Sequence, residues 1–241
     1  MTEKELFTIV GIRPEPAAPK KKVSRPKGFP WVSVVLMGAI VLCCLFAEVL
    51  MTKDPSYLDL KNFNVAPNAE FLFGTDTLGR DIFSGIWYGG RISITIGFLA
   101  TLISTFIAVV YGSVSGIAPV WLDTLMMRFT EIFLSVPGLL LVLFLQAILG
   151  EANVLTLSIV IGVTSWASIA KVIRTEVRQI RSSEYVVASK CMGGRFFHIL
   201  RKHLAPNFIA SIMFMVVMNV RGAIVSESPL SFMGMGLPLE I

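Results

Sequence analysis

Five long apolar runs dominate this sequence and constrain its fold more than any other feature. They are Trp31–Met51, Ile92–Ala118, Ile132–Gly150, Ala152–Ala170 and Phe208–Ser226. Together they contain two charged residues, Glu48 and Arg221. A helix crosses the ~30 Å hydrocarbon layer with roughly 20 apolar residues. An open strand cannot cross it, because its backbone polar groups would stay unpaired. The sequence therefore predicts an all-α integral membrane protein with five spans.

The composition agrees with lipid as the main solvent and argues against an enzyme. Apolar residues make up 54% of the chain and charged residues 15%, whereas a soluble domain carries about 25% charged residues. The sequence has no glycine-rich phosphate loop with Lys-Ser/Thr, and it offers no nucleophile–base–acid arrangement. His198 and His203 are five residues apart, which does not place both on one helical face. We therefore predict no catalytic residue, no cofactor bound by this chain and no metal site.

The positive charges predict how the chain is oriented in the membrane. Seven Lys or Arg residues lie in the tail 1–30 and eight in the segment 171–206, against three in 52–90 and none after Ser226. Loops rich in Lys and Arg stay in the cytoplasm. The tail, the short turn near Asp123 and the loop 171–206 are therefore predicted to be cytoplasmic, and 52–90 is predicted to be an extracytoplasmic loop. The net charge of +5 reflects this topology rather than a nucleic-acid partner.

The loop 171–206 is the most informative segment. The fourth span is predicted to continue past the membrane as a helix with one apolar stripe, Ile173, Val177 and Ile180, and one basic stripe, Arg174, Arg178 and Arg181. Ser182 and Ser183 are then candidate N-caps, with Glu184 suited to the first turn of a new helix. Glycines at 193 and 194 predict its end. A short helix between two span-connected helices can pass force from a soluble partner to the membrane.

This loop resembles the cytoplasmic loop of type I ABC importer permeases. The family pattern is Glu-Ala-Ala, three residues, Gly, nine residues, Ile-x-Leu-Pro. The spacing fits throughout, with identities at Ala188, Gly193 and Pro206. The family's Glu is Val187 here and its second Ala is Ser189. The resemblance implies an ATPase-docking loop with these coupling residues: Glu184, Tyr185, Val187, Ala188, Ser189, Gly193, Arg195 and Pro206.

Two further blocks narrow the family. Phe73–Asp81 and Ser231–Gly236 resemble the second permease of dipeptide, oligopeptide and nickel importers, and the resemblance runs from Phe73 to the end of the chain. It implies the type I ABC importer transmembrane-domain fold over 91–241, in a bacterial or archaeal cell membrane. The family has six spans, so we expect this chain to be truncated before the sixth.

The same resemblance implies the partners. These are a homologous permease subunit, two ABC ATPase subunits that hold ATP and Mg, and an extracytoplasmic solute-binding protein. The solute would be a short peptide, or nickel or a metal chelate. Two other functions stay open at this point: a secondary transporter or channel, and a non-transporting membrane scaffold or inactive truncated permease.

Charged residues inside spans usually face protein or water, which makes Arg221 and Glu227 candidate pathway residues. Arg221 has three open roles: it can pair with Glu227, line the pathway or reach the membrane surface. Arg128 and Glu131 are predicted to form a local ion pair.

Three other patterns predict local structure. Gly74–Asp81 is interpreted as turns and a helix cap before a short helix near Ile82–Tyr88. Pro137 predicts a kink in the third span. Glycines at 97, 112, 116 and 162 predict close helix packing.

Overall fold

The computed structural model describes residues 31–59, 61–150, 152–181, 191, 193, 205–233 and 236, with backbone only for 205–211. Every regular element within these residues is a helix, which confirms the all-α class. The chain divides into two compact units, Met1–Ala39 and Ile40–Ile241. The described part begins with α1, Trp31–Leu45, and a short α2, Ala47–Leu50.

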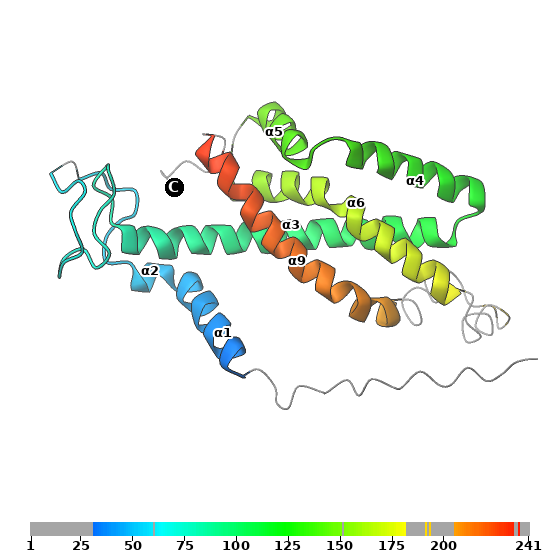
Figure 1. The fold of residues 1–241 in the computed structure, drawn as a ribbon, viewed down its shortest axis with the longest axis horizontal. Helices are drawn as coiled ribbons and strands as arrows, with labels where there is room; N and C mark the ends of the chain where they lie inside the picture. Colours follow the sequence, from blue (N-terminus) through cyan, green and yellow to red (C-terminus); the bar gives the residue numbers. More distant parts are fainter. Residues whose placement is uncertain are drawn as a thin grey trace, which may run out of the picture. The chain divides into compact units, whose positions relative to one another are not determined.

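The longest element is α3, Ile82–Ile117. Its 36 residues correspond to about 54 Å at 1.5 Å per residue, and it runs the length of the bundle (Figure 1). The sequence predicted a separate short helix near Ile82–Tyr88 within an extracytoplasmic loop, and the structure corrects this, because that stretch is the first part of α3. Gly90 lies inside α3 and lets Cys44 approach, since an added Cβ would lie 2.8 Å from the Cys44 sulfur.

The second long helix, α6 (Val154–Arg181), packs along α3. Glycines make this approach possible. A Cβ added at Gly112 would lie 2.6 Å from the carbonyl oxygen of Ala170, and one at Gly162 would lie 2.9 Å from that of Ala100. The predicted close packing at these glycines is confirmed. The predicted continuation of this helix beyond Ala170 is also confirmed, because α6 extends to Arg181.

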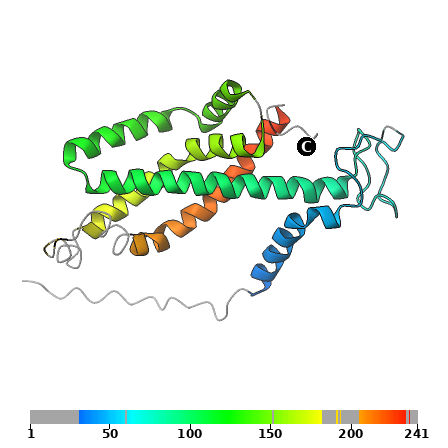
Figure 2. The ribbon, with the colours of Figure 1, turned by 180° about the vertical axis from the view of Figure 1, so that it is seen from behind.

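The last described helix, α9 (Ala205–Phe232), crosses both α3 and α6, as the two opposite views show (Figures 1 and 2). Two buried clusters hold the three helices together. One includes Ala108, Trp166, Ile173 and Ile212, and the other includes Ile96, Leu157, Ala223 and Leu230. Gly97 admits Ile224 of α9, whose Cγ1 lies 2.7 Å from where a Cβ would be.

Between α3 and α6 the chain forms two helices, α4 (Val120–Ser135) and α5 (Gly138–Leu149), bent by 86°. The predicted kink at Pro137 is confirmed, and it is a break between two helices rather than a bend within one. A residue before proline avoids the helical region, and Val136 accordingly has a ψ of 130°. The expected short turn near Asp123 is the first turn of α4 instead.

Length and composition identify two described helices, α3 and α6, that could each cross a membrane. The bent pair α4–α5 makes a third if it is one span. The predicted total of five spans stays a prediction.

The segment before α3 has the predicted turn and cap chemistry. Asp81 is the N-cap of α3, and its carboxylate accepts a hydrogen bond from the Ser84 backbone N–H at 3.1 Å. Asp76 Oδ1 accepts from the backbone N–H groups of Leu78 and Arg80 at 2.8 and 2.9 Å. Gly79 has a φ of +74°, which favours glycine because it lacks a Cβ.

Candidate coupling site and translocation pathway

The basic stripe at the end of α6 converges on one carboxylate of α4. Arg174 donates to both oxygens of Asp123, from Nε and Nη2, each at 2.5 Å. Arg178 Nη1 donates to Asp123 Oδ2 at 3.1 Å. Ser115 of α3 donates from its hydroxyl to Asp123 Oδ1 at 2.7 Å. These residues, together with Arg181, form what we call the Asp123 cluster.

Burial strengthens the ion pair between Asp123 and Arg174. The Asp123 side chain is 6% exposed and the Arg174 side chain 22% exposed, so the ion pair is little screened by water. Asp123 lies between Ala118 and Ile132, outside the predicted spans. The hydrogen bonds from Arg174 outweigh the opposing effect of burial and, with the Ser115 bond, lower the pKa of Asp123 to about 2. The carboxylate is therefore ionised at any physiological pH.

Arg181 adds a second attachment between α6 and α3. Its Nη1 donates to the carbonyl oxygen of Gly116 at 3.0 Å, one of the last carbonyls of α3, which have no partner within their own helix. On the other face of α6, Ile173 and Val177 are fully buried in the core. The two predicted stripes thus hold the end of α6 against α3 and α4 by different means.

The coupling residues themselves are described only in part. Glu184, Tyr185, Val187, Ala188, Ser189 and Arg195 lie outside the described residues. Gly193 lies in a turn with a φ of +83°, and Pro206 lies in the first turn of α9. The roles of all eight residues in coupling stay predictions.

The two candidate pathway residues of α9 lie in different environments. Arg221 is exposed, whereas Glu227 is buried, with 8% exposure. Glu227 accepts hydrogen bonds from the hydroxyls of Ser93 at 3.2 Å and Ser231 at 2.6 Å. Its carboxylate is therefore held by serines rather than by Arg221. Nearer the middle of the bundle, the Asn219 amide donates to the Ser104 hydroxyl at 2.6 Å, so polar contacts recur between α3 and α9.

Comparison with known proteins identifies the family. The family described as the binding-protein-dependent transport system inner membrane component matches residues 108–240, more than half of the chain. This chain belongs to that family. The match begins within α3 and includes the Asp123 cluster, the predicted coupling loop and α9.

Individual relatives agree with this assignment. The permease is 37% identical over 210 residues to the oligopeptide transport system permease protein OppC of Bacillus subtilis, covering 87% of this chain and 68% of the relative. It is 42% identical over 174 residues to the dipeptide transport system permease protein DppC of the same organism, covering 72% and 54%. It is 32% identical over 216 residues to the oligopeptide transport system permease protein AmiD of Streptococcus pneumoniae, covering 87% and 70%. The chain thus aligns with about half to two thirds of the length of these proteins.

Sequence reasoning about the permease missed the ion pairs of Glu48 and Asp123. Glu48 was assigned no partner, and it pairs with Arg91 at 2.6 Å. Asp123 was placed in a turn, with no partner assigned to it. These pairs join residues far apart in the chain. Their only signal in the sequence is a charged residue near the end of a predicted span. The predicted Arg128–Glu131 pair is confirmed at 2.9 Å.

Proposed function

We propose that this permease forms part of the translocation pathway of an ATP-driven importer for short peptides. The match over 108–240 supports the permease role, and the relatives named as oligopeptide and dipeptide permeases support the solute class. A homologous permease completes the pathway, two ABC ATPase subunits bind ATP and Mg, and an extracytoplasmic binding protein delivers the peptide. The membrane is that of a bacterial or archaeal cell, with the tail 1–30 in the cytoplasm.

The observation that carries a coupling mechanism is the attachment of α6 at its loop-proximal end. A push by the ATPases on the segment after α6 reaches Arg181, the last residue of α6, through the backbone. Because the Asp123 cluster ties this end to α3 and α4, the three helices move together instead of α6 bending alone. Close packing at Gly112 and Gly116 prevents sliding between α3 and α6. Movement of the loop therefore reaches the whole length of α3.

Cross-linking tests the docking role of the loop. Ala188→Cys is introduced with Cys191→Ser, because Cys191 is exposed and would react as well. The variant is co-expressed with its ATPase subunits carrying a cysteine in their permease-facing cleft, and a disulfide is expected. Thr77→Cys in the predicted extracytoplasmic segment is the matched control and forms none. A folded Ala188→Cys permease that never captures an ATPase would contradict the proposal.

A transport assay tests the solute. Vesicles with the complete importer and its binding protein are expected to accumulate a labelled dipeptide only when ATP is supplied. ATP-driven uptake of other solutes without any uptake of di- or tripeptides would refute the peptide assignment.

A further inference from the structure

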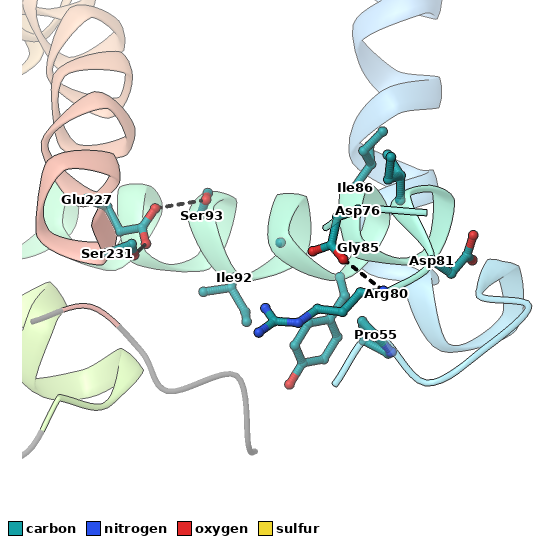
Figure 3. Close-up of a pocket in the computed structure, with 13 residues that line it drawn as sticks. Pro55, Asp76, Arg80, Asp81, Gly85, Ile86, Ile92, Ser93, Glu227 and Ser231 are labelled. Carbon is teal, nitrogen blue, oxygen red and sulfur yellow. Dashed lines mark hydrogen bonds between the residues drawn. The ribbon is translucent and has the colours of Figure 1, made fainter. Parts of the chain in front are cut away.

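A cavity of about 420 Å³ lies where the first turns of α3 meet the preceding segment and the end of α9. Its lining includes Arg80, Gly85, Ile86, Ile92, Ser93 and Glu227 (Figure 3). The volume is in the range of small-molecule sites, about 300–1,000 Å³. Three segments far apart in the sequence build this cavity, so it is a product of the tertiary fold.

The first unusual feature of the cavity is an unpaired cation. The Arg80 side chain extends toward the part of the cavity where Ile92 and Ser93 lie (Figure 3). Its Nε is buried and has no hydrogen-bond partner within the described chain, and no ion pair of Arg80 is found there. The Arg80 side chain as a whole is half-buried, but a buried N–H group without an acceptor is costly. An anionic group entering the cavity would remove that cost.

The second feature is a buried anion in the same cavity. Glu227 is 8% exposed, and within the described part of the chain it accepts hydrogen bonds from the neutral hydroxyls of Ser93 and Ser231. Among the described residues it forms no ion pair. Arg80 and Glu227 thus line one cavity with opposite charges and do not pair with each other. The other two carboxylates of the lining, Asp76 and Asp81, accept hydrogen bonds from backbone N–H groups just before and at the start of α3. The ligand that complements both charges is a zwitterion.

The third feature is the open space beside Gly85. Glycine inside a helix is less stable than alanine by about 1 kcal/mol, so it usually has a packing reason. A Cβ added at Gly85 would meet nothing within 4 Å in the described part of the molecule, so close packing there does not require glycine. Its small size leaves the cavity open instead. The apolar side chains of Ile86 and Ile92 supply walls against which a peptide can pack.

We propose that this cavity binds the two termini of a short peptide. The C-terminal carboxylate binds the Arg80 guanidinium, whose fork matches a carboxylate with two parallel hydrogen bonds. The N-terminal ammonium binds Glu227. A dipeptide in extended form spans about 7 Å, which suits a cavity of this volume. This inference rests on the proposed import of peptides and assigns Glu227, rather than Arg221, to the solute.

Photo-labelling tests the cavity directly. The binding protein is left out, because it selects peptides as well and would obscure the preference of the cavity. The complete importer in nanodiscs is irradiated with a dipeptide that has free termini and carries a diazirine side chain, and the labelled segments are identified by mass spectrometry. Label is expected within residues 80–93 and 227–231. Arg80→Gln is expected to reduce the labelling by at least about tenfold, because a hydrogen bond to a charged group is lost. Arg80→Lys keeps the charge and is expected to reduce the labelling by less.

Competition with modified peptides shows which terminus each residue binds. In the wild type, a C-terminally amidated dipeptide should compete at least about tenfold less well than the free dipeptide. In Arg80→Gln the two should compete equally. For the N-terminus, an N-acetylated dipeptide should compete less well than the free dipeptide in the wild type, and the two should compete equally in Glu227→Gln. Gly85→Leu fills the space and should abolish labelling, whereas Gly85→Ala should retain it. A structural defect would lower labelling without changing preference for a terminus.

Several results would overturn the inference. Equal competition by free and amidated dipeptides in the wild type would exclude Arg80 as the carboxylate ligand. Loss of label when phosphatidylethanolamine replaces phosphatidylglycerol in the nanodiscs would assign the cavity to a lipid headgroup. ATP-driven dipeptide uptake by the same importer separates the two proposals. Uptake without labelling rejects this site alone, and an importer that never transports peptides rejects the proposed function.

Discussion

A single carboxylate joins three helices in this permease. Asp123 receives hydrogen bonds from Ser115 of α3 and from two arginines of α6. An exposed ion pair contributes at most about 1 kcal/mol, and Arg128–Glu131 on the same helix is of that kind, with side chains 73% and 49% exposed. Burial distinguishes the two pairs. Removing one partner of a buried pair leaves an uncompensated charge, which costs more than the exposed pair contributes.

Asp123→Asn is expected to destabilise the permease by about 3 kcal/mol, because it leaves Arg174 without its counter-ion. Thermal unfolding in detergent at pH 7 measures this effect. Glu131→Gln on the same helix is the matched control and should change stability by less than about 1 kcal/mol. Equal effects of the two substitutions would show that the cluster is not buried in the folded protein.

The pH dependence follows from the pKa of Asp123, lowered to about 2 by Arg174. The unfolded chain has an ordinary pKa of about 3.9, so the folded state favours the ionised form. The stabilisation is complete above that value and is lost as pH falls toward 2. The stability difference between wild type and Asp123→Asn should therefore be constant from pH 8 to about pH 5 and shrink below about pH 4. A difference that changes between pH 6 and 8 would contradict this assignment.

At the scale of elements, α3 and α6 form the central pair because glycine lets their backbones touch. The carbonyl oxygen of Ala170 occupies the position that a side chain at Gly112 would need. Backbone atoms cannot rotate away as a side chain can, so the two helices would have to separate. Gly222 in α9 has nothing within 4 Å of an added Cβ in the described structure.

Gly112→Ala is expected to destabilise the bundle by roughly 1–3 kcal/mol, the usual cost of overpacking. Gly222→Ala should be neutral or stabilising by up to about 1 kcal/mol, through helix propensity alone. The yield of monodisperse permease after detergent extraction and its melting temperature compare the two. Equal tolerance of both substitutions would mean that α3 and α6 are not in backbone contact.

At the scale of the whole molecule, α3 connects two distant regions. The Asp123 cluster lies at the C-terminal end of α3, and the cavity lined by Arg80 and Glu227 lies near its N-terminal end. α3 is continuous over its 36 residues. Movement of the loop-proximal end of α6 can therefore reach the cavity through one rigid element, without a chain of side-chain rearrangements.

In the complete importer, Asp123→Asn is expected to raise the ATP consumed per peptide transported by about fivefold or more, which is the scale of a typical coupling energy. The ATPases should still dock, because the loop is unchanged. The charge exchange Asp123→Arg with Arg174→Asp should restore part of the coupling. Rates are compared per folded importer. A variant that loses hydrolysis and transport in equal proportion would show that the cluster only stabilises the fold.

The sequence predicted the local features of the candidate site better than its contacts. The two stripes of α6, the cap at Asp81 and the kink at Pro137 depend on residues within one or two helical turns, and all three are confirmed. The sequence predicted a kink at Pro137 but not the size of its angle. The angle between α4 and α5 is 86°, and it depends on the surfaces against which the two helices pack. The continuation of Ile82–Tyr88 into α3 was missed, because the loop was predicted to extend to residue 90, whereas Gly90 lies inside α3 against Cys44.

The sequence alone predicts the all-α class, the location in a membrane and the family. These depend on span length, apolar composition and motif spacing, which are properties of residues close together in the chain. The partners of charged residues do not follow from the sequence. Arg174 meets Asp123 across 51 positions, and Arg80 shares a cavity with Glu227. The packing of α4 against α3 and α6, and of α9 near the start of α3, brings these groups together. The distance between residues far apart in the chain is determined by how helices cross and not by sequence separation.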